Sequence, residues 1–191
     1  WNPSQKHLLF VARMSPEKGP EVLLRAYAQV AAECPRVHLH MVGGGPLYRS
    51  CQALAGQLGI ADRVTFHSWV ALEELPWFYS ASYALVVPSF SEPLGRVILQ
   101  AMACRTLVIG SRVGGIPDLI KERETGLLFE KGQPEDLARQ LRWALTHEEE
   151  TRAMADRAMN FINTYQRWPS VARRIQRDVY QPLLAARRDD R

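Results

Sequence analysis

A strand–loop–helix unit that recurs along most of the chain is the strongest constraint on its fold. Short apolar runs lead into loops and then into segments with apolar residues at helical spacing. The expected strands cover residues 7–12, 36–42, 64–66, 83–87, 106–109 and 126–129, and the expected helices 20–33, 47–58, 72–81, 94–104, 116–120, 134–145, 148–163 and 169–180. Continuous rather than alternating apolar runs are typical of strands buried on both faces of a parallel sheet. The sequence therefore predicts a doubly wound α/β fold.

Length and composition are those of one globular domain. The chain has 191 residues, of which 47% are hydrophobic and 23% charged. Its apolar runs fall far short of the roughly 20 residues that a membrane span needs, and residues 1–20 lack a signal-peptide pattern. Because the chain begins with Trp1 rather than Met, we expect it to be part of a longer protein.

Cysteine usage and charge restrict the compartment and the partners. The three cysteines are odd in number and form no C-x-x-C pair, which favours a reducing cytoplasm over a disulfide or zinc framework. The net charge is +4, and residues 168–191 contribute +3 of it through six arginines and three aspartates. The rest of the chain lacks a basic stripe with interleaved aromatic residues, so nucleic acid is not an expected partner. We interpret the tail as a solvated helix end or a peripheral contact with an anionic membrane.

The loop after the first expected strand has the chemistry of an anion site. Arg13 and Lys18 lie between the end of that strand and the start of the helix at residue 20. Ligands bind to such sheets outside the carboxyl ends of the strands, and a helix N-terminus favours phosphate. Arginine can bind two phosphate oxygens at once and lysine adds a mobile positive charge. The alternative is that both side chains are merely solvated.

The loop of residues 89–95 joins another expected strand to a helix. Glu92 can accept hydrogen bonds from two neighbouring hydroxyls, as a sugar offers, while the amides that follow it face a phosphate. Its alternative role is that of an acidic residue at a helix N-terminus, which stabilises the helix by about 0.3–1 kcal/mol. Gly95 permits close approach of the backbone to a ligand.

Several other motifs are excluded or have ordinary explanations. Tyr48 stands where the third glycine of G-x-G-x-x-G belongs, and the chain contains neither a P-loop, nor H-E-x-x-H, nor G-x-S-x-G. His38 and His40 alternate on one expected strand without a visible third ligand, so we interpret them as packed or edge histidines and expect no metal site. Trp69, Trp77, Phe78 and Tyr79 are interpreted as core and groove wall.

Six short motifs together resemble one known family. They are Arg13-x4-Lys18-Gly19, Val42-Gly-Gly-Gly-Pro46, Ser91-Glu92-Pro-Leu-Gly95, Gln100-Ala-Met-Ala-Cys104, Val113-Gly-Gly-Ile-Pro117 and Thr125-Gly-Leu-Leu128. In this order they resemble the C-terminal, donor-binding domain of retaining glycosyltransferases of family 4, the group 1 type with the GT-B fold. The resemblance covers nearly the whole chain. It implies a Rossmann-like domain at residues 1–165, followed by a C-terminal helix and basic tail at 166–191 that pack toward a missing N-terminal domain.

The resemblance also implies roles for individual residues. Arg13 and Lys18 match the positions that neutralise the donor diphosphate, and Glu92 matches the first carboxylate of the family's Glu-x7-Glu motif, which contacts the donor sugar. These three are the expected catalytic residues. The expected donor-binding residues are Gly44, Trp69, Val70, Pro93, Leu94, Gly95, Val97 and Gln100. No metal or other cofactor is expected, because the chain contains no D-x-D motif.

Two positions depart from the family pattern. Gln100 stands where the second carboxylate usually receives the ribose hydroxyls, which weakens that contact by about 1–2 kcal/mol. Arg105 stands where glycine is common, and a positive φ there would cost roughly 1 kcal/mol.

The implied function is the donor-binding half of a cytoplasmic retaining glycosyltransferase, which moves a sugar from a nucleoside diphosphate sugar to an acceptor hydroxyl. We expect this chain alone to turn over little donor. The alternatives are a catalytically weak nucleotide-sugar binding module and a GT-B relative such as a nucleotide-sugar epimerase.

Overall fold

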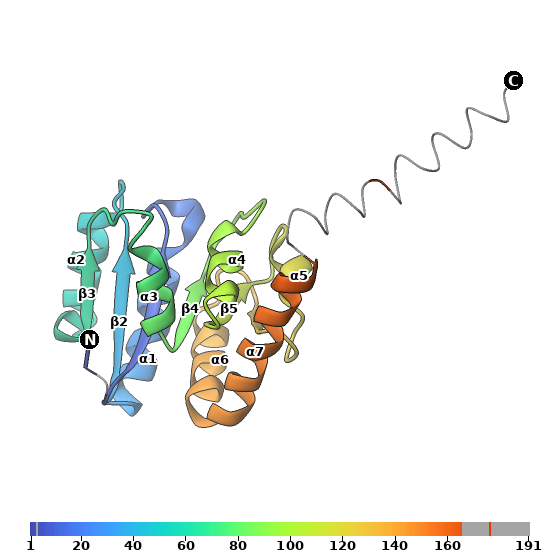
Figure 1. Cartoon of the computed structure of the whole chain (residues 1–191). Coiled ribbons are helices and arrows are strands. Elements are labelled where there is room, and N and C mark those ends of the chain that lie inside the picture. Colours follow the sequence, from blue (N-terminus) through green and yellow to red (C-terminus); the bar gives the residue numbers. More distant parts are fainter. Residues whose placement is uncertain (3, 166–175, 177–191) are drawn as a thin grey trace, which may run out of the picture.

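The computed structural model describes residues 1–2, 4–165 and 176, and its centre is a parallel β-sheet (Figure 1). The strands in the described part are β1 (Lys6–Val11), β2 (Val37–Val42), β3 (Val64–His67), β4 (Ala84–Val87), β5 (Leu107–Ser111) and β6 (Leu127–Phe129). Their order across the sheet is β3-β2-β1-β4-β5-β6, and every neighbouring pair is parallel. This order confirms the predicted doubly wound α/β fold.

Helices cover both faces of the sheet (Figure 1). The described helices are α1 (Pro20–Glu33), α2 (Tyr48–Gln57), α3 (Leu75–Ala81), α4 (Arg96–Ala103), α5 (Ile116–Leu119), α6 (Pro134–Thr146) and α7 (Glu148–Tyr165). One apolar cluster joins the sheet to α1, α2 and α6, and a second joins it to α3, α4, α5 and α7. Within β1, Leu8 and Phe10 belong to the first cluster and Leu9 to the second. A strand that packs on both faces needs apolar residues at successive positions, which explains its unbroken hydrophobic run.

Two helices begin two or more residues later than the sequence predicts. α3 starts at Leu75 rather than at residue 72, because residues 72–74 form a turn in which the Glu74 carboxylate accepts the Ala71 amide at 3.1 Å. α4 starts at Arg96 rather than at residue 94, because Gly95 is left-handed with φ of 59° and cannot continue a helix backwards. The helix expected at residues 169–180, and the expected segment 166–191, lie outside the described residues apart from Gln176.

Arg105, two residues after the end of α4, has the positive φ that the sequence comparison with glycine raised for this position. Its φ is 60°, in the region that favours glycine. The Arg105 guanidinium forms an exposed ion pair with Asp156 of α7, in which Nη2 donates to Oδ2 at 2.8 Å. This contact links the end of α4 to the outer helix α7. None of the helices in the described part of the chain is both long enough and apolar enough to cross a bilayer.

Candidate functional site

The candidate site lies where the connections of two neighbouring strands diverge. β1 leads to α1 on one face of the sheet, and its neighbour β4 leads to α4 on the other. At such a switch point the loops separate and leave a crevice at the carboxyl ends of the strands. A backbone hydrogen bond fastens the two loops together, since the Phe90 amide donates to the Glu17 carbonyl at 2.8 Å.

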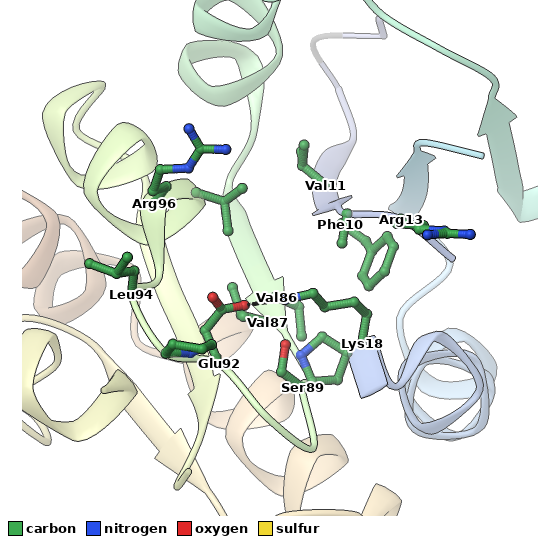
Figure 2. A pocket seen from close by; sticks show the side chains of 14 residues that line it. Phe10, Val11, Arg13, Lys18, Val86, Val87, Ser89, Glu92, Leu94 and Arg96 are labelled. Atoms are coloured by element: carbon green, nitrogen blue, oxygen red, sulfur yellow. Dashed lines mark hydrogen bonds and ion pairs between the residues drawn. The ribbon is translucent and has the colours of Figure 1, made fainter. Parts of the chain in front are cut away.

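A hollow of about 300 Å³ opens between these two loops (Figure 2). Six of the residues singled out from the sequence line it: Arg13, Lys18, Glu92, Pro93, Leu94 and Val97. Its floor is apolar and is formed by the ends of β1 and β4, including Phe10 and Val86. Charged groups therefore stand at the rim of an apolar base, as in many small-molecule sites.

Lys18 and Glu92 meet across the hollow. The Lys18 Nζ lies 2.6 Å from Glu92 Oε2, and the two side chains are only 24% and 12% exposed (Figure 2). The other carboxylate oxygen, Oε1, accepts the Gly95 amide at 3.1 Å at the start of α4. The geometry of Glu92 is thus compatible with both roles considered from the sequence. Its Oε1 binds the amide at the start of α4, and its carboxylate lies in the hollow, where it could accept hydrogen bonds.

Glycine at position 19 allows the two loops to approach each other. Gly19 has φ of 61°, and a Cβ built on it would lie 2.1 Å from the Pro88 carbonyl oxygen. Any other residue would push the β1 loop away from the β4 loop. The Gly19 backbone thus positions Lys18 opposite Glu92.

Arg13 lies at the exposed rim of the hollow, beyond the end of β1. Near it, the pKa of Glu17 is lowered, first by the Ser15 hydroxyl, which donates to the Glu17 carboxylate at 2.6 Å, and further by the Arg13 and Lys18 charges. Glu17 is therefore ionised at neutral pH and partly balances Arg13.

A second hollow of about 440 Å³ adjoins the first through Arg13. It is lined by the glycine loop after β2 and by the segment after β3, which brings together three more of the predicted residues: Gly44, Trp69 and Val70. Trp69 is 86% exposed, and Trp77 of α3 is 54% exposed. Trp69 therefore agrees with the interpretation as groove wall, and Phe78 and Tyr79 are buried as core. Trp77 is neither buried nor part of either lining, so the interpretation was wrong for Trp77 alone.

Gln100 is placed differently from the other predicted residues. It lies on α4 outside the lining of both hollows. Its Oε1 accepts the Tyr79 hydroxyl at 3.0 Å. Burial raises the pKa of Tyr79, so the phenol keeps its proton and donates it to this bond. The amide oxygen of Gln100 is therefore engaged inside the protein, and its Nε2 group remains as a donor.

Two polar residues of the first hollow's lining were not predicted as site residues. Ser89 is buried at the end of β4, and Ser111 of β5 donates to its carbonyl oxygen at 2.6 Å. Arg96 is exposed at the first position of α4 and also lines the hollow (Figure 2). Its place directly after the predicted loop of residues 89–95 was a signal that could have identified it.

The histidines form a chain across the sheet away from the hollows. His7 Nδ1 lies 3.0 Å from His40 Nε2, and His40 Nδ1 lies 3.0 Å from His67 Nε2. His7 Nε2 lies 2.9 Å from the Asn2 carbonyl, which can only accept. His7 Nε2 is therefore the donor in that bond. In a chain of neutral rings, His7 Nδ1 then accepts from His40, and His40 Nδ1 accepts from His67.

Burial is the main cause that lowers the pKa of His40, to about 3, and the neighbouring His38, His7 and His67 add to it. Among the described residues no group of three or more histidine, cysteine or acidic side chains could hold a metal ion. His40 is buried, and His38 is half-buried with its Nε2 2.8 Å from the Thr65 hydroxyl, which fits their interpretation as packed or edge histidines.

A charged hollow at the switch point of a doubly wound parallel sheet defines the class of Rossmann-like ligand-binding domains. The family model for glycosyl transferases group 1 matches residues 1–161. The chain belongs to this family, as the six motifs suggested.

Individual named proteins are also similar to this chain in sequence or in structure. The chain is 40% identical over 178 residues to D-inositol 3-phosphate glycosyltransferase of Rhodococcus opacus, covering 90% of this chain and 40% of that protein. Sucrose-phosphate synthase from Thermosynechococcus elongatus superposes with a TM-score of 0.84 at 32% identity, covering 97% and 47% of the two chains.

HepE of Anabaena, solved in complex with UDP, superposes with a TM-score of 0.81 at 26% identity, covering 95% of this chain and 49% of that one. The chain thus spans less than half the length of these relatives. The fold is the Rossmann-like α/β type found in GT-B glycosyltransferases.

Proposed function

We propose that this chain is the donor-binding half of a retaining glycosyltransferase, which transfers a sugar from a nucleoside diphosphate sugar to an acceptor hydroxyl. The observation that carries the proposal is the convergence of Arg13, Lys18 and Glu92 at one hollow on the switch point of the sheet. The UDP complex of HepE, a relative of the same fold, supports a nucleotide ligand. The acceptor-binding half would be supplied by a preceding domain.

Departure of the nucleoside diphosphate is the step that these side chains would assist. Negative charge develops on the diphosphate as the bond to the sugar breaks, and fixed positive groups stabilise that charge. Arg13 and Lys18 lie on the β1 side of the hollow, and the α4 N-terminus lies on the other. Because these groups supply positive charge without a metal ion, the proposed reaction includes no metal and no other cofactor.

Ligand binding would rearrange the ion pair. In the free protein Lys18 holds Glu92 Oε2 at 2.6 Å. A diphosphate attracts Lys18 away from the carboxylate, which frees Oε2 to accept sugar hydroxyls while Oε1 stays on the Gly95 amide. The same two residues thereby bind the phosphate and the sugar of one donor molecule.

The three cysteines are free thiols, which suits a reducing cytoplasm, and we propose that location. A contact with the preceding domain and a peripheral membrane contact are further parts of the proposal.

Thermal unfolding against UDP, GDP and ADP and their sugar conjugates tests the proposal. A ligand at about 100 times its Kd stabilises the folded state by about 2.7 kcal/mol. We expect one nucleotide series to raise the unfolding midpoint of the wild type and not of Lys18→Ala. Lys121→Ala, which removes an exposed lysine of another surface, serves as the control and should respond like the wild type. Equal stabilisation of Lys18→Ala by the same nucleotide would contradict the proposed diphosphate site.

A second candidate function is a nucleotide-sugar binding module with weak activity. The observation that favours it is Gln100, a neutral amide whose oxygen already accepts the Tyr79 hydroxyl and which lacks the charge that strengthens a carboxylate's bond to ribose. Gln100→Glu discriminates between the two functions. Tighter nucleotide binding and faster sugar transfer by the variant would indicate that the natural site is weakened, as in a binding module. Unchanged or lower affinity and transfer rate would indicate an enzyme adapted to glutamine at this position.

A further inference from the structure

The charges around the 300 Å³ hollow are not balanced. Three cations and one carboxylate line it: Arg13, Lys18, Arg96 and Glu92. Lys18 is compensated by Glu92 at 2.6 Å, and the Arg13 charge acts on Glu17. Arg96 forms no hydrogen bond or ion pair with any residue in the described part of the chain. Arg13 likewise forms no ion pair in that part of the chain, but Glu17 partly balances its charge, so Arg96 is the cation of this lining for which no such partner is seen.

Arg96 gains nothing from its place in the fold. It is the first residue of α4, and the first turn of that helix contains no acidic residue. The positive end of a helix dipole makes a cation unfavourable there. Its side chain is exposed rather than packed against the core. Neither packing nor a local charge accounts for an arginine at this position, whereas an anion bound in the hollow would.

The position of Arg96 separates it from the two cations that we propose to bind the diphosphate. Arg96 extends from the α4 wall and Arg13 from the β1 side, and Figure 2 shows them on opposite sides of the hollow, with the Lys18–Glu92 pair below both. If Arg13 and Lys18 hold the diphosphate, Arg96 is left facing the part of the substrates that lies beyond Glu92.

We propose that Arg96 binds a second anionic group, a carboxylate or phosphate, carried by the transferred sugar or by the acceptor. This inference rests on the proposed function and names the substrate class of the same hollow. A guanidinium binds either group through two parallel N–H···O bonds, which gives it the geometry to select a charged substrate over a neutral one.

Binding titrations at low ionic strength test this inference, with the nucleoside diphosphate identified by thermal unfolding. One arm compares its glucose conjugate with its glucuronic acid conjugate, and the other adds glucose or glucose 6-phosphate to the nucleotide-saturated chain. Each arm is run on the wild type, on Arg96→Gln and on Arg25→Gln, which removes an exposed arginine of α1. Both variants are first checked for a cooperative unfolding transition no lower than that of the wild type.

We expect the anionic compound to bind about fivefold or more tightly than its neutral counterpart in one arm, which identifies the source of the anion. Arg96→Gln should remove that preference and leave the affinity for the nucleoside diphosphate alone within about twofold, while Arg25→Gln keeps the preference. Equal binding of anionic and neutral compounds in both arms, or a preference that survives in Arg96→Gln, would overturn the inference and leave the proposed function standing. A wild type that binds no nucleotide would overturn the proposed function and this inference with it.

Discussion

Acidification should destabilise the folded chain through His40. This side chain is only 4% exposed, and burial lowers its pKa to about 3, against about 6.5 in an unfolded chain. The unfolded chain therefore binds the proton first, and stability is lost as the pH falls from about 6.5 toward 3. Integrated between about pH 7 and pH 5, the loss from His40 alone is about 2 kcal/mol.

The hydrogen-bond chain explains why protonation is unfavourable. In the neutral chain His40 Nδ1 accepts from His67 Nε2, so a proton added to Nδ1 places two donors face to face at 3.0 Å. The groups that act on His40 are His7, His38, His67 and the amino group of Trp1, all of which disfavour a further positive charge. The pKa values of His38 and His67 are lowered as well, chiefly by burial, so their titration acts in the same direction.

Urea unfolding at pH 7 and pH 5 measures the effect. The wild type should lose about 2 kcal/mol more between the two pH values than His40→Gln, whatever the absolute stability of that variant. If His40→Gln and the wild type lose the same free energy within about 0.5 kcal/mol, His40 does not titrate as its burial predicts.

Substitutions at two further positions, Arg105 and Gly19, test the backbone by equilibrium unfolding. Arg105→Gly and Arg105→Ala both remove the exposed ion pair with Asp156, but only glycine relieves the strain of the positive φ of 60°. The glycine variant should therefore be more stable than the alanine variant by about 1–2 kcal/mol. Equal stabilities of the two variants would show that the backbone at this position is not strained. Gly19→Ala should lower the free energy of unfolding by at least about 2 kcal/mol, because the added Cβ would lie 2.1 Å from the Pro88 carbonyl oxygen. The control Ala28→Gly in α1 should lower it by only about 1 kcal/mol. Similar losses in the two variants would contradict the close approach of Gly19 to Pro88.

The layers of the fold were predictable because burial leaves a mark on each strand separately. Ala84–Val87 is buried at every position, and such a run reads as a strand of a two-sided sheet wherever its partners lie. Helix starts were less predictable because they depend on backbone angles. The start of α4 is decided by the left-handed Gly95, and an apolar pattern that includes Leu94 carries no information about that angle.

The site was predictable to the level of loops and not of contacts. Arg13 and Lys18 follow a strand, so their place at the edge of the sheet came from the sequence alone. The pairing of Lys18 with Glu92 joins residues 74 positions apart and depends on β1 lying next to β4. The histidine chain likewise depends on the register that sets His7 and His67 on either side of β2. Neither arrangement leaves a periodicity in the sequence.

The hydrogen bond from the Phe90 amide to the Glu17 carbonyl has a consequence for how this site can be altered. A substitution in one loop should displace the other loop, so substitutions in the two loops should not have additive effects on binding. A double-mutant cycle across Lys18 and Leu94 should therefore give a coupling free energy that the two single substitutions do not reveal. A search for altered donor preference that varies one loop at a time would miss compensating pairs, whereas a library that varies both together would sample them.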